Sequence, residues 1–172
     1  QEKTLVILKT INSSARNTYK LLGNLLDWAM SQTGKTEFKK EYIFLEDLII
    51  GTIEMMNGNS QAKNLKVSYE INDRIRFFAD RNMLNIILIN LMTNAIKYSH
   101  NDGRVKIVVS TIPNFIKFSI IDNGVGIEAE RLDKLFKINE KTSTPGTDNE
   151  KGTGLGLILC KEFVEKHGGK IG

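Results

Sequence analysis

Near the N-terminus, apolar or small residues recur three and four positions apart. They are Leu8, Ile11, Ala15, Thr18, Leu22, Leu25 and Ala29. This spacing places them on one stripe of a helix, so we predict one long helix over residues 3–31. The stripe needs a partner, either the rest of the chain or other bundle helices. We favour a helical hairpin that dimerises into a bundle.

After a polar joint at Ser31–Thr36, shorter patterns of both kinds alternate. They predict strands over 38–44, 65–71, 75–78, 103–111 and 114–121, and helices over 46–62, 81–98, 128–134 and 153–167. The order predicts an α+β fold, a two-layer α/β sandwich in which helices cover one face of a mixed sheet. We therefore divide the chain into a helical segment, 1–33, and a domain, 36–172.

Composition narrows the class of protein. The 172 residues are 41% hydrophobic and 26% charged with only two prolines, which is typical of a folded domain and not of a disordered chain. The net charge of +4 comes from dispersed lysines, so nucleic acid is not an expected partner. The single cysteine, Cys160, fits a reducing compartment and is expected to be a buried, inert thiol. We expect a piece of a longer protein, because Gln1 stands within a helical pattern without a cap and a new strand begins at Ile171–Gly172.

The helix predicted over 81–98 carries a polar stripe on an otherwise apolar surface. Asn90, Asn94 and Lys97 stand at i, i+4 and i+7, which places them on one face. This stripe is either a solvated edge or a ligand-facing wall. In the second case, amide oxygens suit a hard cation such as Mg²⁺, and the lysine suits a phosphate.

The stretch IIDNGVGI, residues 120–127, follows a strand and contains two glycines. Gly124 begins a match to G-x-G-x-x-A, yet the second parallel strand of a dinucleotide-binding unit does not follow, so we reject that interpretation. What remains is either a plain Asp-Asn-Gly turn or a ligand site. In a ligand site, the carboxylate of Asp122, which can only accept hydrogen bonds, would accept one from the exocyclic amine of adenine.

The stretch KGTGLGL, residues 151–157, leads glycines into a helix. Free backbone N–H groups at a helix N-terminus are a ready phosphate site. The polar segment before it, Lys137–Lys151, is long for a compact domain, which suggests a mobile lid. Three features together indicate a nucleotide site. They are the stripe that suits a cation and a phosphate, the carboxylate that suits adenine, and the lid with glycines at its end.

Four segments, in order, resemble the sequence boxes of sensor histidine kinases. They are NLMTNAIKYS for the N box, DNGVGI for the G1 box, LDKLF for the F box and GTGLGL for the G2 box. The tail KEFVEKHGGKI is also similar to this branch, and LLGNLLDWAMSQTGK resembles the second helix of the dimerisation and phosphoacceptor hairpin. The resemblance extends to the wider superfamily of gyrase, mismatch-repair and heat-shock chaperone ATPases. It implies a Bergerat-type ATP-binding fold preceded by part of the hairpin.

The resemblance also implies roles for single residues, with ATP and Mg²⁺ as cofactors. Asn94 would ligate Mg²⁺ with Asn90 beside it, Lys97 would hold phosphate, and Asp122 would bind the adenine amine. The remaining positions implied to bind ATP would line the pocket, let the base approach, or anchor and hinge the lid: Tyr98, Gly124, Gly126, Ile127, Phe136, Lys151, Gly152, Thr153, Gly154, Leu155 and Gly156.

The activity implied is that of a protein-histidine kinase in bacterial two-component signalling. Such enzymes transfer the γ-phosphoryl group of ATP to a histidine and then to an aspartate of a response-regulator receiver domain. The resemblance further implies a homodimer through the N-terminal helix, a cytoplasmic location, and membrane attachment only through regions outside this sequence.

The sequence departs from the family at the phosphoacceptor. The family's acceptor histidine precedes an acidic residue on the first bundle helix, whereas His100 precedes Asn-Asp-Gly and His167 precedes Gly-Gly-Lys. We therefore expect this chain to bind ATP without phosphorylating itself, and no catalytic residue is assigned.

Two other functions compete with this interpretation. A nucleotide-binding scaffold that dimerises without phosphoryl transfer would more often have lost Asn94 or the lid glycines. A chaperone- or gyrase-type ATPase uses a carboxylate near the position of Asn90, which offers no base, so hydrolysis of ATP should be slow.

Overall fold

The computed structural model describes residues 37–172 except 72–73, 138–143, 151 and 153. Before residue 37 it describes Thr4, Ile11, Ala15, Thr18, Tyr19, Leu22, Gly23, Leu26 and Ala29. The chain forms two compact units, Gln1–Glu37 and Phe38–Gly172. Every described residue before 31 is helical, in agreement with the helix predicted over 3–31. Leu8 and Leu25 of the predicted stripe lie outside the described residues.

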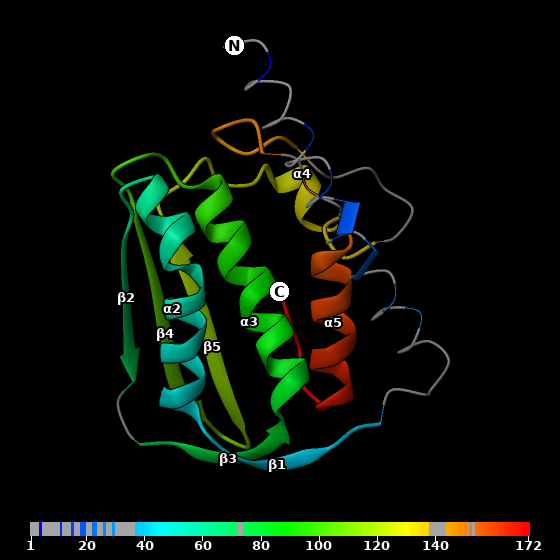
Figure 1. Ribbon diagram of the computed structural model, residues 1–172. Coiled ribbons are helices and arrows are strands. Elements are labelled where there is room, and N and C mark those ends of the chain that lie inside the picture. Colours follow the sequence, from blue (N-terminus) through cyan, green and yellow to red (C-terminus); the bar gives the residue numbers. More distant parts are fainter. Residues whose placement is uncertain are drawn as a thin grey trace. The chain divides into compact units, whose positions relative to one another are not determined.

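The second unit contains the strands and helices predicted for it, with ends shifted by three residues or fewer (Figure 1). Their bounds are β1 Lys40–Phe44, α2 Leu45–Ala62, β2 Lys66–Ile71, β3 Arg76–Asp80, α3 Arg81–Tyr98, β4 Arg104–Ile112, β5 Phe115–Asp122, α4 Ala129–Leu132 and α5 Gly156–Lys166. None of the helices in the described ranges is long and apolar enough to span a bilayer.

The strands form two sheets and not one. β4 pairs in parallel with β2 and antiparallel with β5, which gives a mixed three-stranded sheet in the order β2-β4-β5. β1 and β3 form a separate antiparallel pair. The predicted α+β class is confirmed, and the mixed sheet is smaller than a single sheet of all five strands would be.

Helix α3 lies between α2 and α5, and helices α2 and α3 cover one face of the three-stranded sheet (Figure 1). Alternate residues of β4 point into this interface, and Val105, Ile107 and Val109 are fully or almost fully buried. From the helices, Leu88 and Leu159 are equally buried. Burial of this apolar surface is the main force that holds α3 in place.

Two helices are shorter than predicted. Helix α5 begins at Gly156 and not at residue 153, and Gly154 just before it has a φ of +76°, a left-handed conformation that breaks a helix. Helix α4 ends at Leu132, and residues 133–136 form turns.

Candidate functional site

Helix α3 presents its polar stripe to neighbouring parts of the chain. Asn90 and Asn94 are half-buried, and Lys97 is only 7% exposed, so the stripe is not a fully solvated edge. The Nδ2 of Asn90 donates to the carbonyl of Ile86 at 2.9 Å. Its Oδ1 faces the start of α5, where a Cβ added to Gly156 would lie 2.5 Å from that oxygen. The lack of a side chain at Gly156 therefore lets the start of α5 pack closely against the Asn90 amide.

The turn after β5 packs onto the C-terminal end of α3. The Val125 N–H donates to the carbonyl of Tyr98 at 3.2 Å, and the Gly124 N–H donates to Oδ1 of Asp122 at 2.9 Å. A Cβ at Gly124 would overlap the Tyr98 carbonyl oxygen, so only glycine fits there. The resemblance explains Gly124 by the approach of a base, whereas the structure explains it by the approach of α3.

Asp122 forms the Asx-type turn that the plainer interpretation predicts, and its side chain remains exposed at the end of β5. A carboxylate has two oxygens, so holding its own turn leaves it capacity to accept from a ligand amine. The turn and the ligand interpretations are therefore compatible. Gly126, with a φ of +68°, lets the chain leave the turn.

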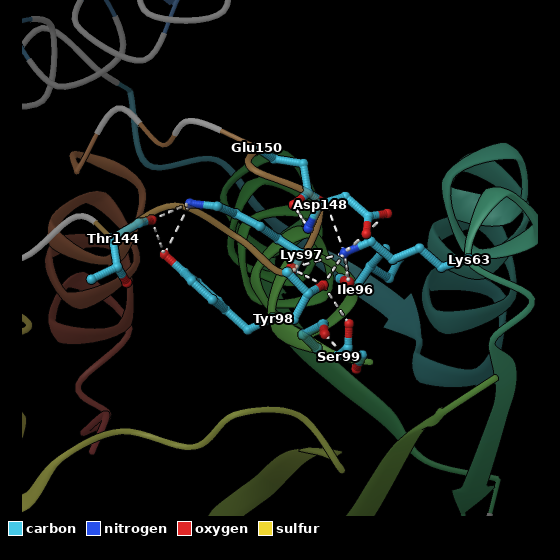
Figure 2. Close-up of polar contacts among 10 residues, drawn as sticks. Lys63, Ile96, Lys97, Tyr98, Ser99, Thr144, Asp148 and Glu150 are labelled. Atoms are coloured by element: carbon cyan, nitrogen blue, oxygen red, sulfur yellow. Dashed lines mark hydrogen bonds and ion pairs between the residues drawn. The ribbon is translucent and has the colours of Figure 1, made fainter. Parts of the chain in front are cut away.

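A second segment, Thr144–Glu150, reaches the same end of α3, and we call it the 144–150 loop. Its Thr147 donates its N–H to the Lys97 carbonyl at 3.1 Å and its hydroxyl to the Ser99 carbonyl at 2.7 Å. In return, Lys97 Nζ donates to the Thr144 carbonyl at 3.0 Å and to the Tyr98 hydroxyl at 2.9 Å (Figure 2). The side chain predicted to hold phosphate is thus positioned by the loop.

Lys63, at the end of α2, contacts this end of α3 and was not among the site residues predicted from the sequence. It is 5% exposed, and its Nζ lies 2.9 Å from the Lys97 carbonyl, 2.7 Å from Thr147 Oγ1 and 2.7 Å from Glu150 Oε1 (Figure 2). The sequence around it, QAKNLK, reads as an ordinary polar helix end, because most lysines in such places are solvated. The charged partner of this buried ammonium becomes visible only in three dimensions.

Glu150 shows the electrostatic effect of this contact. Partial burial by itself would raise the pKa of its carboxyl group. The hydrogen bond from Lys63, together with backbone N–H donors, outweighs burial, so the pKa is lowered. Glu150 is therefore held as the charged partner of a buried ammonium.

The remaining predicted positions differ in exposure, and two of them lie outside the described residues. Gly152 and Ile127 are exposed, Leu155 and Phe136 are half-buried, and Phe136 ends the turns after α4. Lys151 and Thr153 fall outside the described residues, so their predicted roles stay predictions.

The two histidines and the cysteine have structural surroundings. His167 Nδ1 donates to the Phe163 carbonyl at 2.7 Å, so Nε2 is the acceptor for the Asp80 N–H at 3.1 Å. His100 is exposed. Burial raises the pKa of the Cys160 thiol to about 12, which fits the predicted inert thiol.

The structure thus brings the asparagine–lysine stripe, the glycine turn and the start of α5 to one side and one end of α3. This arrangement of a helix, a sheet edge and glycine segments fits the predicted class of ATP-binding domains. The chain belongs to the family of histidine kinase-, DNA gyrase B- and HSP90-like ATPases, whose model matches residues 79–172. Within this family the similarity is to sensor histidine kinases, which confirms the predicted resemblance.

Two curated relatives show the range of the similarity. The "Non-motile and phage-resistance protein" of Caulobacter vibrioides is 30% identical over 165 residues, 94% of this chain and 20% of that protein. The "Hybrid signal transduction histidine kinase C" of Dictyostelium discoideum is 33% identical over 174 residues, 95% of this chain and 14% of that protein. The chain therefore spans a fifth or less of the length of these relatives.

Among solved structures, the catalytic domain of histidine kinase ThkA shares 28% identity with a TM-score of 0.65. The match covers 76% of this chain and 82% of that one. A structure of ThkA in complex with response regulator protein TrrA covers 96% of this chain and 45% of that one, with a TM-score of 0.73 and 22% identity. This second match shows the fold alone.

Proposed function

We propose that this chain is the ATP-binding catalytic part of a protein-histidine kinase. The observation that carries the proposal is the convergence of the Asp122–Gly126 turn and the 144–150 loop on the last turn of α3. They bring one exposed carboxylate and one ammonium to a helix end surrounded by glycines. Phosphoryl transfer requires mainly such positioning and charge, and few covalent partners.

In this proposal the site recognises the two ends of ATP with different chemistry. The exposed carboxylate of Asp122 accepts a hydrogen bond from the exocyclic amine of adenine. The base lies beside Gly126 and Ile127. Lys97 donates from its ammonium to a phosphate oxygen and keeps the Thr144 carbonyl as a second acceptor, since an ammonium has three N–H donors. A charged acceptor makes the stronger hydrogen bond, so the phosphate contact is favourable.

Mg²⁺ fits this site through amide oxygens. Among the described residues there is no cluster of three His, Cys, Asp or Glu side chains that could hold a metal by itself. Mg²⁺ is commonly bound by few protein ligands together with substrate phosphates, and it supplies charge neutralisation there. Asn94, with Asn90 one turn away and close to Gly156, is the residue that would ligate it.

The phosphoacceptor in this proposal is a histidine other than the two in this sequence. His167 has both ring nitrogens engaged with backbone groups, Phe163 and Asp80, so neither is a free nucleophile. His100 lacks the acidic neighbour expected of an acceptor. The chain should therefore bind ATP and leave its own histidines unmodified.

The remaining parts of the proposal concern partners and location. The response-regulator partner is supported by ThkA, which is known in complex with response regulator protein TrrA. Dimerisation is supported by exposed apolar side chains in the N-terminal unit, among them Ile11, Leu22 and Leu26. A cytoplasmic location fits both the use of ATP and the single thiol.

Calorimetric titration with a non-hydrolysable ATP analogue and Mg²⁺ tests the proposal. The wild-type chain should bind, Asp122→Ala should lose binding, and Asn94→Ala should bind without dependence on Mg²⁺. Asp47→Ala and Asn59→Ala, at exposed positions of α2, are matched controls and should bind like the wild type. No binding by a wild-type chain that circular dichroism shows to be folded would overturn the kinase assignment.

A further inference from the structure

We propose that Lys63 is a positioning residue of this site, which holds the 144–150 loop against the last turn of α3 and thereby orients Lys97. The inference rests on the proposed function, because it assigns to Lys63 an effect on phosphate binding. Lys63 does not touch the ligand in this account, and it acts through Thr147 and Glu150.

Hydrogen bonds hold the backbone of Lys63 in place. Lys63 caps α2, and its N–H donates to the Ser60 carbonyl at 3.3 Å. Its own carbonyl accepts the Asp102 N–H at 2.9 Å, and the next residue, Asn64, turns the chain with a φ of 51°. The side chain therefore starts from a rigid point, so its ammonium has a defined position.

The ammonium of Lys63 is surrounded by more acceptors than it has protons. Two are carbonyls of the last turn of α3, those of Ile96 at 3.2 Å and Lys97 at 2.9 Å. Two are side chains of the loop, Thr147 Oγ1 and Glu150 Oε1, both at 2.7 Å. A buried charge is costly without partners, so loop and helix end are each needed to stabilise it. The helix end adds the negative pole of its dipole.

The loop in turn determines where Lys97 points. Figure 2 shows Lys63 reaching the loop from the side of α2, while the side chain of Lys97 extends the other way, toward Thr144. The Thr144 carbonyl accepts from Lys97 Nζ, and Gly146 is packed so closely that an added Cβ would lie 2.6 Å from Lys97 Cγ. Displacement of the loop would therefore release the side chain of Lys97.

A purely structural role for Lys63 makes a different prediction. If Lys63 only stabilised the fold, its loss would weaken every ligand equally, because only the folded fraction would change. If it positions Lys97, its loss weakens the phosphate end of the ligand and spares the base. The affinity of adenosine relative to that of the ATP analogue separates the two roles.

The experiment measures both affinities by competition, with Mg²⁺ present, for Lys63→Met and Glu150→Gln. We expect about tenfold weaker binding of the ATP analogue, equivalent to about 1.4 kcal/mol, with less than about twofold change for adenosine. The double variant should lose no more than Lys63→Met alone, because Lys63→Met already removes the ion pair that Glu150→Gln weakens. Lys117→Met, at an exposed position of β5, is the matched control and should bind like the wild type.

If Lys63→Met does not fold, Glu150→Gln alone tests whether Lys63 positions Lys97. This variant should fold, because Glu150 lies in a surface loop with a partly exposed side chain. Amide hydrogen exchange, which needs no nucleotide, should accelerate about tenfold at Thr147 and Asn149 in either variant. Unchanged exchange, or equal losses for adenosine and the ATP analogue, would overturn the inference and leave the proposed function standing. Absence of binding by the wild-type chain would instead overturn the proposed function itself.

Discussion

At its N-terminal end, α3 is capped by Asp80 of β3, which is itself hydrogen-bonded to the chain before β1 and to the end of α5. Asp80, the last residue of β3, accepts the Met83 N–H at 2.9 Å and the Lys39 N–H at 2.8 Å, and donates its own N–H to His167. At its C-terminal end, α3 is closed by Lys63, by the turn that contains Gly124 and by the 144–150 loop. Both ends satisfy backbone groups that a helix leaves unpaired.

The difference lies in which parts of the chain supply the partners. At the N-terminal end the partners stand beside regular elements that a core fixes in place. At the C-terminal end two of the three partners are loops, which are where binding residues are commonly carried on a rigid scaffold. We therefore expect changes at the first end to alter stability alone, and changes at the second to alter nucleotide binding as well.

The largest effect is expected for Gly124→Ala. The added Cβ would overlap the Tyr98 carbonyl oxygen, and neither backbone can yield without moving α3 or the turn. Overpacking against backbone should lower the free energy of unfolding by about 3 kcal/mol and abolish binding of the ATP analogue. Urea denaturation and calorimetry measure the two losses. A variant as stable as the wild type would refute the packing given for this turn.

Asp80→Ala should destabilise the chain less than Gly124→Ala does, and it should leave the affinity for the ATP analogue unchanged. Loss of a helix N-cap that also accepts the Lys39 N–H should lower the free energy of unfolding by about 2 kcal/mol. The affinity for the ATP analogue, measured where the variant is folded, should match the wild type. A specific loss of affinity would show that the two ends of α3 are not separable.

Gly58→Ala, away from both ends of α3, should stabilise the chain. Gly58 lies on the exposed side of α2 with nothing within 4 Å of an added Cβ. Alanine has the higher helix propensity, so the free energy of unfolding should rise by up to about 1 kcal/mol. Thermal denaturation of Gly58→Ala and Gly124→Ala side by side would compare the stability effect of alanine at an uncrowded glycine with its effect at a crowded one. Destabilisation by Gly58→Ala would contradict the position of α2.

The smallest effect is a pH dependence of the C-terminal end alone. The pKa of Glu150 is lowered from 4.5 in the folded chain, so its contribution to stability is complete above the unfolded value. The contribution is lost as the pH falls through the folded pKa, below 4.5. Amide exchange at Thr147 should therefore accelerate there in the wild type and not in Glu150→Gln. Equal acceleration in both would assign the effect to another group.

Regular elements could be predicted because periodicity reports burial directly. The pattern around Asn90 and Lys97 predicted α3 with its observed bounds, and the strand patterns over 103–111 and 114–121 predicted β4 and β5 to within one residue. The split into two sheets was not predictable, since pairing of β1 with β3 depends on distant residues. The role of Lys63 was also hidden, because its partners stand 33 to 87 positions further along the chain.

We propose that the C-terminal end of α3, and not its N-terminal end, assembles the nucleotide site. Amide NMR spectra of the wild-type chain, recorded during titration with a non-hydrolysable ATP analogue and Mg²⁺, test it most directly. We predict shifts of the amide signals of Tyr98, Gly124 and Thr147, with those of Met83 and His167 unchanged. Absent shifts, or shifts confined to Met83 and His167, would contradict it.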